Sequence, residues 1–219
     1  MDINVKLHFE RGYIADPYWP AMEKLINIQK TSGMNRVRDQ GKRDKALSDY
    51  IASMGMTVDD YHQLGEQAAR PFYTWADVLL EQNGRQPNEI VVPAHQMYGC
   101  LAEASKWVSK AMRLASPEQI RTVLKVTDFS TGKAESDGVW ERFVTVKGGA
   151  GNTLSNQRGL RSDPYIKDFV AEGRLHFSDN VLDQEKVRRF MVFAGSEIGV
   201  GAARKMDWGR FTVRDWATT

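Results

Sequence analysis

The stretch GSEIGVGAARKMDWGRFTV, residues 195–213, combines many glycines with cationic side chains just before the last predicted strand of the chain. Its glycines stand at positions 195, 199, 201 and 209, and its cations include Arg204, Lys205 and Arg210. A helical pattern precedes the stretch and an extended pattern follows it, so it is more than a simple connector. Because glycine has no Cβ, this spacing indicates that another group closely approaches the backbone.

The composition is typical of a globular protein of 219 residues, with 42% hydrophobic and 26% charged residues. The formal net charge of +2 is too small to indicate nucleic-acid binding by itself. The single cysteine, Cys100, has no partner for an internal disulfide and no zinc-ligand spacing around it. No apolar run approaches the roughly 18 residues of a membrane span. We therefore expect a cytoplasmic protein without a membrane segment, metal or cofactor.

The amino-terminal part combines one strand with a long helical region. Alternate residues from Ile3 to Phe9 are apolar, which predicts a strand with one buried face. From residue 16 to about residue 83 the pattern becomes helical, and Thr57 and Asp60 are spaced as a capping box. We interpret residues 16–90 as a helical insertion.

The remaining chain alternates extended and helical patterns. In order, these are a helix that starts near Pro93, a strand over 140–147, a glycine-rich segment over 147–163, a strand over 169–177, a helix capped by Asp179 or Asp183 and ended by Gly195, and a strand over 209–216. This order predicts an α+β fold over residues 1–219 as a single domain, with helices on one face of a ferredoxin-like, RNA-recognition-type antiparallel sheet. The segment 147–163 is predicted to be a mobile, thumb-like loop.

Two motifs resemble the RAMP superfamily, the RNA-recognition-fold proteins of CRISPR systems. The ending AGSEIGVGAARKMDWGRFTV is similar to the carboxy-terminal glycine-rich loop of that superfamily. The stretch IVVPAHQMYGCLAEAS resembles a second feature, a proline-started helix with an internal glycine. Pro93, Gln96, Met97 and Gly99 stand at matching places there, and the usual serine is absent. The two motifs cover less than a quarter of the chain.

The resemblance implies a non-catalytic subunit that binds guide RNA. Backbone subunits of Cascade-type effector complexes polymerise along single-stranded guide RNA and insert a thumb between its bases. The helical insertion and the loop over 147–163 resemble the elaborations of such a subunit. The implied partners are guide RNA or another single-stranded nucleic acid, further copies of the chain and other effector subunits.

The candidate RNA-binding residues combine the two motifs with three clusters of cations. Phosphate contacts require positive side chains, and close contacts with the backbone require glycine. The set is Arg36, Arg38, Lys42, Arg43, Gln96, Lys147, Arg158, Arg161, Gly199, Gly201, Arg204, Lys205, Gly209 and Arg210. An alternative is that the glycines only permit tight packing between helix and strand, with Trp208 as a plug.

Other functions remain open at this point. His8 and His176 both fall in strand patterns, and as general acid and base they would suit an RNA-processing endonuclease of the RAMP type. A phage-borne relative that interferes with a CRISPR complex or binds single-stranded DNA is another alternative. None of the four histidines has metal-ligand spacing, and neighbours of His8 offer no obvious catalytic partner. We therefore predict no catalytic residues, and a protein that is not an enzyme.

Overall fold

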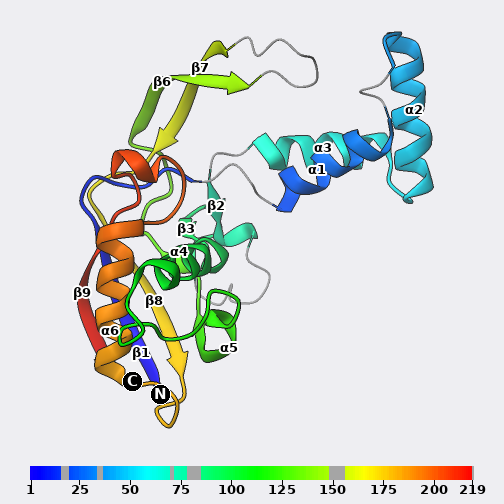
Figure 1. Cartoon of the computed structure of the whole chain (residues 1–219). Helices are drawn as coiled ribbons and strands as arrows, with labels where there is room; N and C mark the ends of the chain where they lie inside the picture. The colour runs from blue at the N-terminus through cyan, green and yellow to red at the C-terminus, as the bar shows by residue number, and fades with distance from the viewer. Residues whose placement is uncertain (16–19, 34–36, 70–71, 78–84, 148–155, 219) are drawn as a thin grey trace. The chain divides into compact units, whose positions relative to one another are not determined.

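The chain forms two compact units in a computed structural model that describes residues 1–15, 20–33, 37–69, 72–77, 85–147 and 156–218 (Figure 1). Unit 1 comprises Met1–Ala15 and Phe72–Thr219, and unit 2 comprises Asp16–Pro71. Unit 1 contains the main sheet, and unit 2 is helical.

The centre of unit 1 is an antiparallel sheet with the strand order β5-β8-β1-β9. Its strands are β1 (Asp2–Phe9), β4 (Leu124–Val126), β5 (Phe129–Ser130), β8 (Phe169–Phe177) and β9 (Thr212–Thr218), with β4 also paired to β8. Two short strands, β2 (Tyr73–Thr74) and β3 (Ile90–Val92), extend the sheet beyond β5, and a 3₁₀ turn (Trp75–Asp77) follows β2.

The connections between these strands define a ferredoxin-like fold. Helix α4 (Ala94–Trp107) and the short α5 (Ile120–Val123) precede β4, and α6 (Gln184–Phe193) joins β8 to β9. Figure 1 shows α4 and α6 on the same face of the sheet. The chain order is therefore βαββαβ, with the fourth strand beside the first, then the third, then the second. The predicted α+β class with an antiparallel sheet is confirmed.

The core lies between this sheet and its two helices. Ile3, Val5, Leu7 and Phe9 are at most 1% exposed, as their alternation predicted. Gly173 of β8 pairs with Val5 of β1 in the regular antiparallel register. The glycine makes room for an aromatic ring of β5, because a Cβ at this position would lie 2.6 Å from the Phe129 side chain.

A two-stranded hairpin replaces much of the predicted loop over 147–163. Strand β6 (Gly138–Lys147) pairs with β7 (Asn156–Tyr165) from Gly138 opposite Tyr165 to Lys147 opposite Asn156. The composition of β7 favours a loop, but the backbone hydrogen bonds to β6 satisfy its polar groups and outweigh that preference. Residues 148–155 of the predicted loop lie outside the described residues.

The base of the hairpin packs on Trp208 of the glycine-rich stretch. The Trp208 ring lies 5.6 Å from that of Trp140 and 5.2 Å from that of Tyr165, measured between centroids. Nearby, the Arg142 Nε atom donates to the Oδ2 atom of buried Asp163 at 3.0 Å. This ion pair compensates for burial of the Asp163 charge.

Unit 2 is a three-helix unit with a core of its own. Its helices are α1 (Pro20–Thr31), α2 (Gln40–Ser53) and α3 (Val58–Ala69). Buried Ile28, Ile51 and Leu64 come from the three different helices and form one cluster. The predicted capping box is present, because the Thr57 N–H donates to Asp60 at 2.7 Å and the Asp60 N–H donates to Thr57 at 3.0 Å.

The helical insertion is shorter than the predicted span of 16–90. The chain leaves unit 1 after Ala15 and returns to it at Phe72, because β2 and β3 already belong to the main sheet. The departure and return points are adjacent, since the ring centroids of Tyr13 and Phe72 lie 6.2 Å apart.

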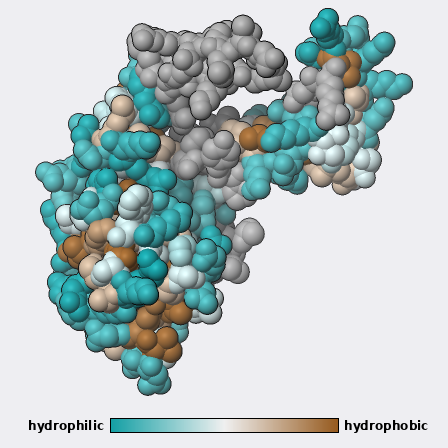
Figure 2. Space-filling view, in the orientation of Figure 1, coloured by the Kyte–Doolittle hydropathy of each residue, from teal (hydrophilic) through white to brown (hydrophobic). Residues whose placement is uncertain are grey.

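The surface shown in Figure 2 is mainly hydrophilic, and its hydrophobic residues form small separate patches. Within the described part of the chain, no helix is both long enough and apolar enough to cross a membrane.

We predict that Ile51→Ala destabilises unit 2 without destabilising unit 1. The side chain is 2% exposed, so the cavity should cost about 2–5 kcal/mol, which is a large share of the stability of so small a unit. Native-state hydrogen exchange should show lost protection in α1, α2 and α3 and unchanged protection in β1 and β8. Leu175→Ala is the matched control in unit 1 and should show the reverse pattern. Equal losses in both units would contradict their independence.

Candidate nucleic-acid interface

The segment after α6 is built by a change of helical type and then by positive backbone dihedrals. A π-helical turn (Ala194–Ile198) continues α6, and Gly199 ends it with a φ of 75°. The prediction that Gly195 ends the helix is wrong. Gly195 lies inside the π-helical turn, where a Cβ would be 2.2 Å from the carbonyl oxygen of Phe211. It is required for packing against the start of the last strand.

The close approach that the glycines predicted is made by the backbone of the chain itself. Gly199, Gly201 and Gly209 all have positive φ values, between 72° and 75°. A Cβ at Gly201 would lie 2.2 Å from the carbonyl oxygen of Ile14, and one at Gly209 would lie 1.8 Å from that of Val200. These contacts support the packing alternative for the glycines. Direct contacts between these three residues and RNA remain a prediction.

We call residues 199–209 the glycine loop. Backbone hydrogen bonds join it to the segment that follows β1. The N–H groups of Ala202 and Gly209 donate to the carbonyl oxygens of Ile14 and Gly12, each at 2.8 Å. Within the loop, the Val200 N–H donates to the Gly209 carbonyl oxygen at 2.9 Å. The loop is therefore a rigid support for the cationic side chains that it carries.

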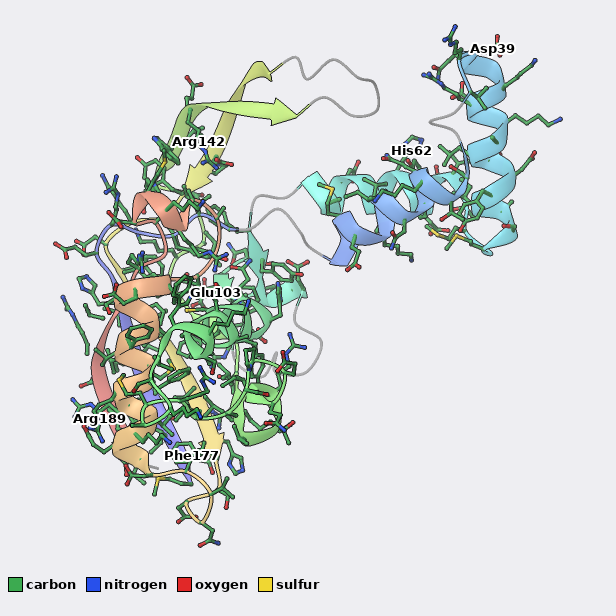
Figure 3. The ribbon with its side chains drawn as sticks, viewed as in Figure 1. Asp39, His62, Glu103, Arg142, Phe177 and Arg189 are labelled. Atoms are coloured by element: carbon green, nitrogen blue, oxygen red, sulfur yellow. The ribbon has the colours of Figure 1, made fainter. Side chains whose placement is uncertain are left out.

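The loop presents its cations on a groove beside the end of α4. Arg204 and Lys205 are exposed on a 3₁₀ turn (Arg204–Met206), and Arg210 follows a few residues later. All three line a cavity of about 630 Å³, together with Glu103 and Trp107 of α4, Phe193 at the end of α6, and Glu197 and Ile198 of the π-helical turn. Figure 3 marks the position of Glu103 on α4. We call this cavity the cationic groove.

Two features fix the geometry of these cations. The Arg210 Nη1 atom donates to the carbonyl oxygen of Ser196 at 2.7 Å, which holds the guanidinium against the loop. Ala203 and Asp207 flank the 3₁₀ turn with φ values of 56° and 65°. Non-glycine residues adopt this conformation at a cost of about 1–3 kcal/mol, and such strained positions are common at functional sites.

The other predicted RNA-binding residues are distributed over the fold. Arg38 and Lys42 are exposed near the start of α2 in unit 2, and Arg43 donates from Nε to the carbonyl oxygen of Val37. Arg36 lies outside the described residues. The remaining three, Lys147, Arg158 and Arg161, belong to the strands of the hairpin. RNA contacts at all these positions remain predictions.

Gln96 differs from the expectation because it lies in the interior. Its side chain accepts a hydrogen bond from the Tyr13 hydroxyl at 2.7 Å, and the residue is 9% exposed. It ties α4 to the segment that also anchors the glycine loop. We therefore assign Gln96 a structural role in unit 1.

The two strand histidines do not form an acid–base pair. Register places His176 opposite Asp2, and His8 is six residues further along β1, so the two lie about 20 Å apart at roughly 3.4 Å per residue. His8 instead donates from Nε2 to Asp168 at 2.9 Å and accepts from Arg214 at Nδ1 at 3.0 Å. The hydrogen bond from His8 lowers the pKa of Asp168. His176 interacts with Asp2 at 3.0 Å.

The thiol of Cys100 is also unsuited to chemistry. The residue is 1% exposed, and burial raises the pKa of its thiol to about 12. A nucleophilic cysteine requires a thiolate, which such an environment disfavours. Within the described ranges, no three histidine, cysteine, aspartate or glutamate side chains are grouped so that they could hold a metal ion.

Trp107 is the residue of the groove that sequence reasoning missed. A tryptophan usually packs in the core or at its rim, yet this side chain is 71% exposed. Its Nε1 atom donates to Glu103 one helical turn earlier, at 3.0 Å. The i, i+4 spacing of these residues was the available signal.

The arrangement of unit 1 thus defines a ferredoxin-like protein with a glycine loop and an adjoining cationic groove. No family model and no curated protein matches the sequence. Solved structures do show likeness. One is a chain in the cryo-EM structure of the type III-B Cmr-beta bound to cognate target RNA, with 10% identity and a TM-score of 0.48, covering 99% of this chain. This chain spans 59% of the length of that one.

The second likeness is to the crystal structure of Cmr6 from Pyrococcus furiosus. It has 13% identity and a TM-score of 0.35, and it covers 98% of each chain. The ferredoxin-like fold of this chain is defined by its own strand order and pairing.

We predict that Gly201→Ala destabilises the protein far more than Gly132→Ala. Both glycines have a φ near 70°, so both substitutions incur the cost of a left-handed alanine, about 1–2 kcal/mol. A Cβ at Gly132 has nothing within 4 Å, whereas one at Gly201 meets Ile14 and Tyr13. Urea unfolding should therefore give an additional loss of at least about 2 kcal/mol for Gly201→Ala. Equal losses in the free energy of unfolding would show that the backbone at Ile14 moves to accommodate the added Cβ at no cost.

Proposed function

We propose that this protein is a non-catalytic, RNA-binding subunit of the RAMP type, which binds single-stranded guide RNA within a CRISPR ribonucleoprotein. The proposal is supported by the placement of the two motifs. The glycine-rich ending forms a rigid loop after the last helix of a ferredoxin-like unit. The helix after Pro93 contacts this ending, because Cys100 donates from Sγ to the carbonyl oxygen of Ala194. Both motifs contribute to the cationic groove, although they are about 90 residues apart in sequence.

The observation that carries the proposal is the gathering of Arg204, Lys205 and Arg210 on one groove. Guanidinium and ammonium groups on a preorganised loop suit phosphate oxygens, and phosphate contacts supply most of the affinity for nucleic acid when sequence is not read. The small net charge of +2 does not reveal this local concentration of positive charge.

The separation of the two strand histidines supports the non-catalytic part of the proposal. RNA cleavage through a 2′-hydroxyl needs an acid and a base on either side of one phosphate, which requires them within a few ångströms of the reacting atoms. His8 and His176 are too far apart along β1 to act on the same phosphate. Incubation with labelled RNA should therefore give no specific cleavage, and cleavage that is lost in His8→Ala would contradict this part.

Self-association along RNA and association with other effector subunits complete the proposal. The hairpin β6–β7 is a candidate for the thumb, because it is a separate two-stranded sheet that packs on the rest of unit 1 through Trp208. Binding of single-stranded DNA is the competing function, and parallel titrations with RNA and DNA of one sequence distinguish the two.

We predict that the double variant Arg204→Ala/Lys205→Ala binds single-stranded RNA more weakly and with a smaller salt dependence. Each phosphate contact on a single strand contributes about 0.7 to the slope of log K against log salt, so loss of two contacts should lower the slope by roughly 1.4. Fluorescence anisotropy with a labelled 20-nucleotide RNA between 50 and 300 mM salt measures both quantities.

The matched control is Arg188→Ala/Arg189→Ala, which removes the same charge from exposed positions of α6. Figure 3 shows Arg189 and Glu103 at separate places in unit 1. This control should retain the affinity and slope of the unmodified protein. Identical effects of the two double variants would mean that only total charge matters, and salt-independent binding would overturn the phosphate-contact proposal.

A further inference from the structure

The exposed indole of Trp107 is held in one orientation. It is the last residue of α4 and is 71% exposed, which leaves a large apolar ring in water. Its Nε1 atom donates to Glu103 Oε1 at 3.0 Å, and the other carboxylate oxygen of Glu103 accepts from Lys106 at 2.7 Å. The hydrogen bonds from Lys106 and Trp107 lower the pKa of Glu103, so the acceptor stays ionised.

A ring fixed in this way is suited to stacking. The hydrogen bond uses the edge of the indole, and stacking uses its face, so the two interactions do not compete. Because the ring is already oriented before a ligand arrives, little side-chain entropy remains to be lost on binding. Aromatic side chains with this property act as platforms for unpaired bases in single-strand-binding proteins.

The surroundings of Trp107 offer apolar surface for the base of a nucleotide and positive charge for its phosphate. Phe193 and Ile198 provide further apolar surface in the cationic groove, and Arg204 and Lys205 line the same groove as exposed cations. The cavity volume of about 630 Å³ is within the range of small-molecule sites, which is about 300–1,000 Å³.

The charge of the groove also favours a nucleic acid. Three cations face two carboxylates, and Glu103 already accepts hydrogen bonds from Lys106 and Trp107. The other lining carboxylate, Glu197, does not accept hydrogen bonds from two such donors in the described contacts. A positive excess beside an exposed tryptophan attracts the phosphate of a nucleotide and leaves the ring to its base.

We infer that the cationic groove is a site for one unpaired nucleotide, with its base stacked on Trp107 and its phosphate at Arg204 and Lys205. This inference rests on the proposed RNA-binding function and adds a base contact to it. Because a base inside a duplex has no free face, the site selects single strands. Because every base has a face that can stack, the site binds single strands independently of their sequence.

The test compares Trp107→Leu, Trp107→Phe and the unmodified protein in binding to a labelled single-stranded RNA. Trp107→Leu should weaken binding about 5- to 150-fold, the equivalent of about 1–3 kcal/mol per stacked base. Trp107→Phe should retain most of the affinity, because it keeps an aromatic face. The salt slope should be the same in all three proteins, since no phosphate contact is removed.

A second arm uses the same RNA with its bases removed at alternating positions. The unmodified protein should bind this abasic RNA more weakly than the complete strand, and Trp107→Leu should bind the two with similar affinity. Val181→Ala, which shortens another exposed apolar side chain of unit 1, is the control and should behave as the unmodified protein. Thermal melting should be unchanged, because Trp107 is exposed.

The outcomes separate this inference from the proposed function. Full RNA affinity in Trp107→Leu, with affinity lost in Arg204→Ala/Lys205→Ala, would overturn the stacking site and leave the RNA-binding proposal in place. Failure of the unmodified protein to bind RNA would overturn both. Equal preference for single-stranded and double-stranded RNA would also contradict the stacking site.

Discussion

The structure of unit 1 depends on the close contact between two backbone segments, the glycine loop and residues 12–14. Hydrogen bonds of 2.8 Å join them, and the space between them is too small for a Cβ at Gly201. The contact fixes the loop that carries Arg204 and Lys205, and the same loop provides Trp208 as the base on which the hairpin packs. Core packing, the cationic groove and the hairpin therefore share one support.

The fold was largely predictable from the sequence, because its strands and helices carry clear periodic patterns. The alternation from Ile3 to Phe9 and the capping residue Asp183, which accepts from the Lys186 N–H at 2.8 Å, are both present as expected. The hairpin was missed because its second strand is stabilised by pairing with the first, which a local pattern does not report. The end of the insertion was misplaced because β2 has only two residues and is too short to show a period.

The site was predictable only in part. Glycine spacing indicated a close backbone approach, but spacing cannot distinguish a ligand from another segment of the same chain. The gathering of Arg204, Lys205 and Arg210 beside α4 follows from local sequence together with helix packing. Exposure of Trp107 depends on where α4 ends relative to the sheet, and burial of Gln96 depends on Tyr13, so both are tertiary properties.

The adjacency of Tyr13 and Phe72 makes unit 2 a removable module in the topological sense. The chain leaves and re-enters unit 1 at neighbouring points. The main sheet could therefore form a continuous structure without the helices of unit 2. A short linker between Ala15 and Phe72 would close the gap with little loop entropy. Relatives with a different insertion, or with none, are therefore compatible with the same core, and the insertion can change over evolution without remodelling the glycine loop.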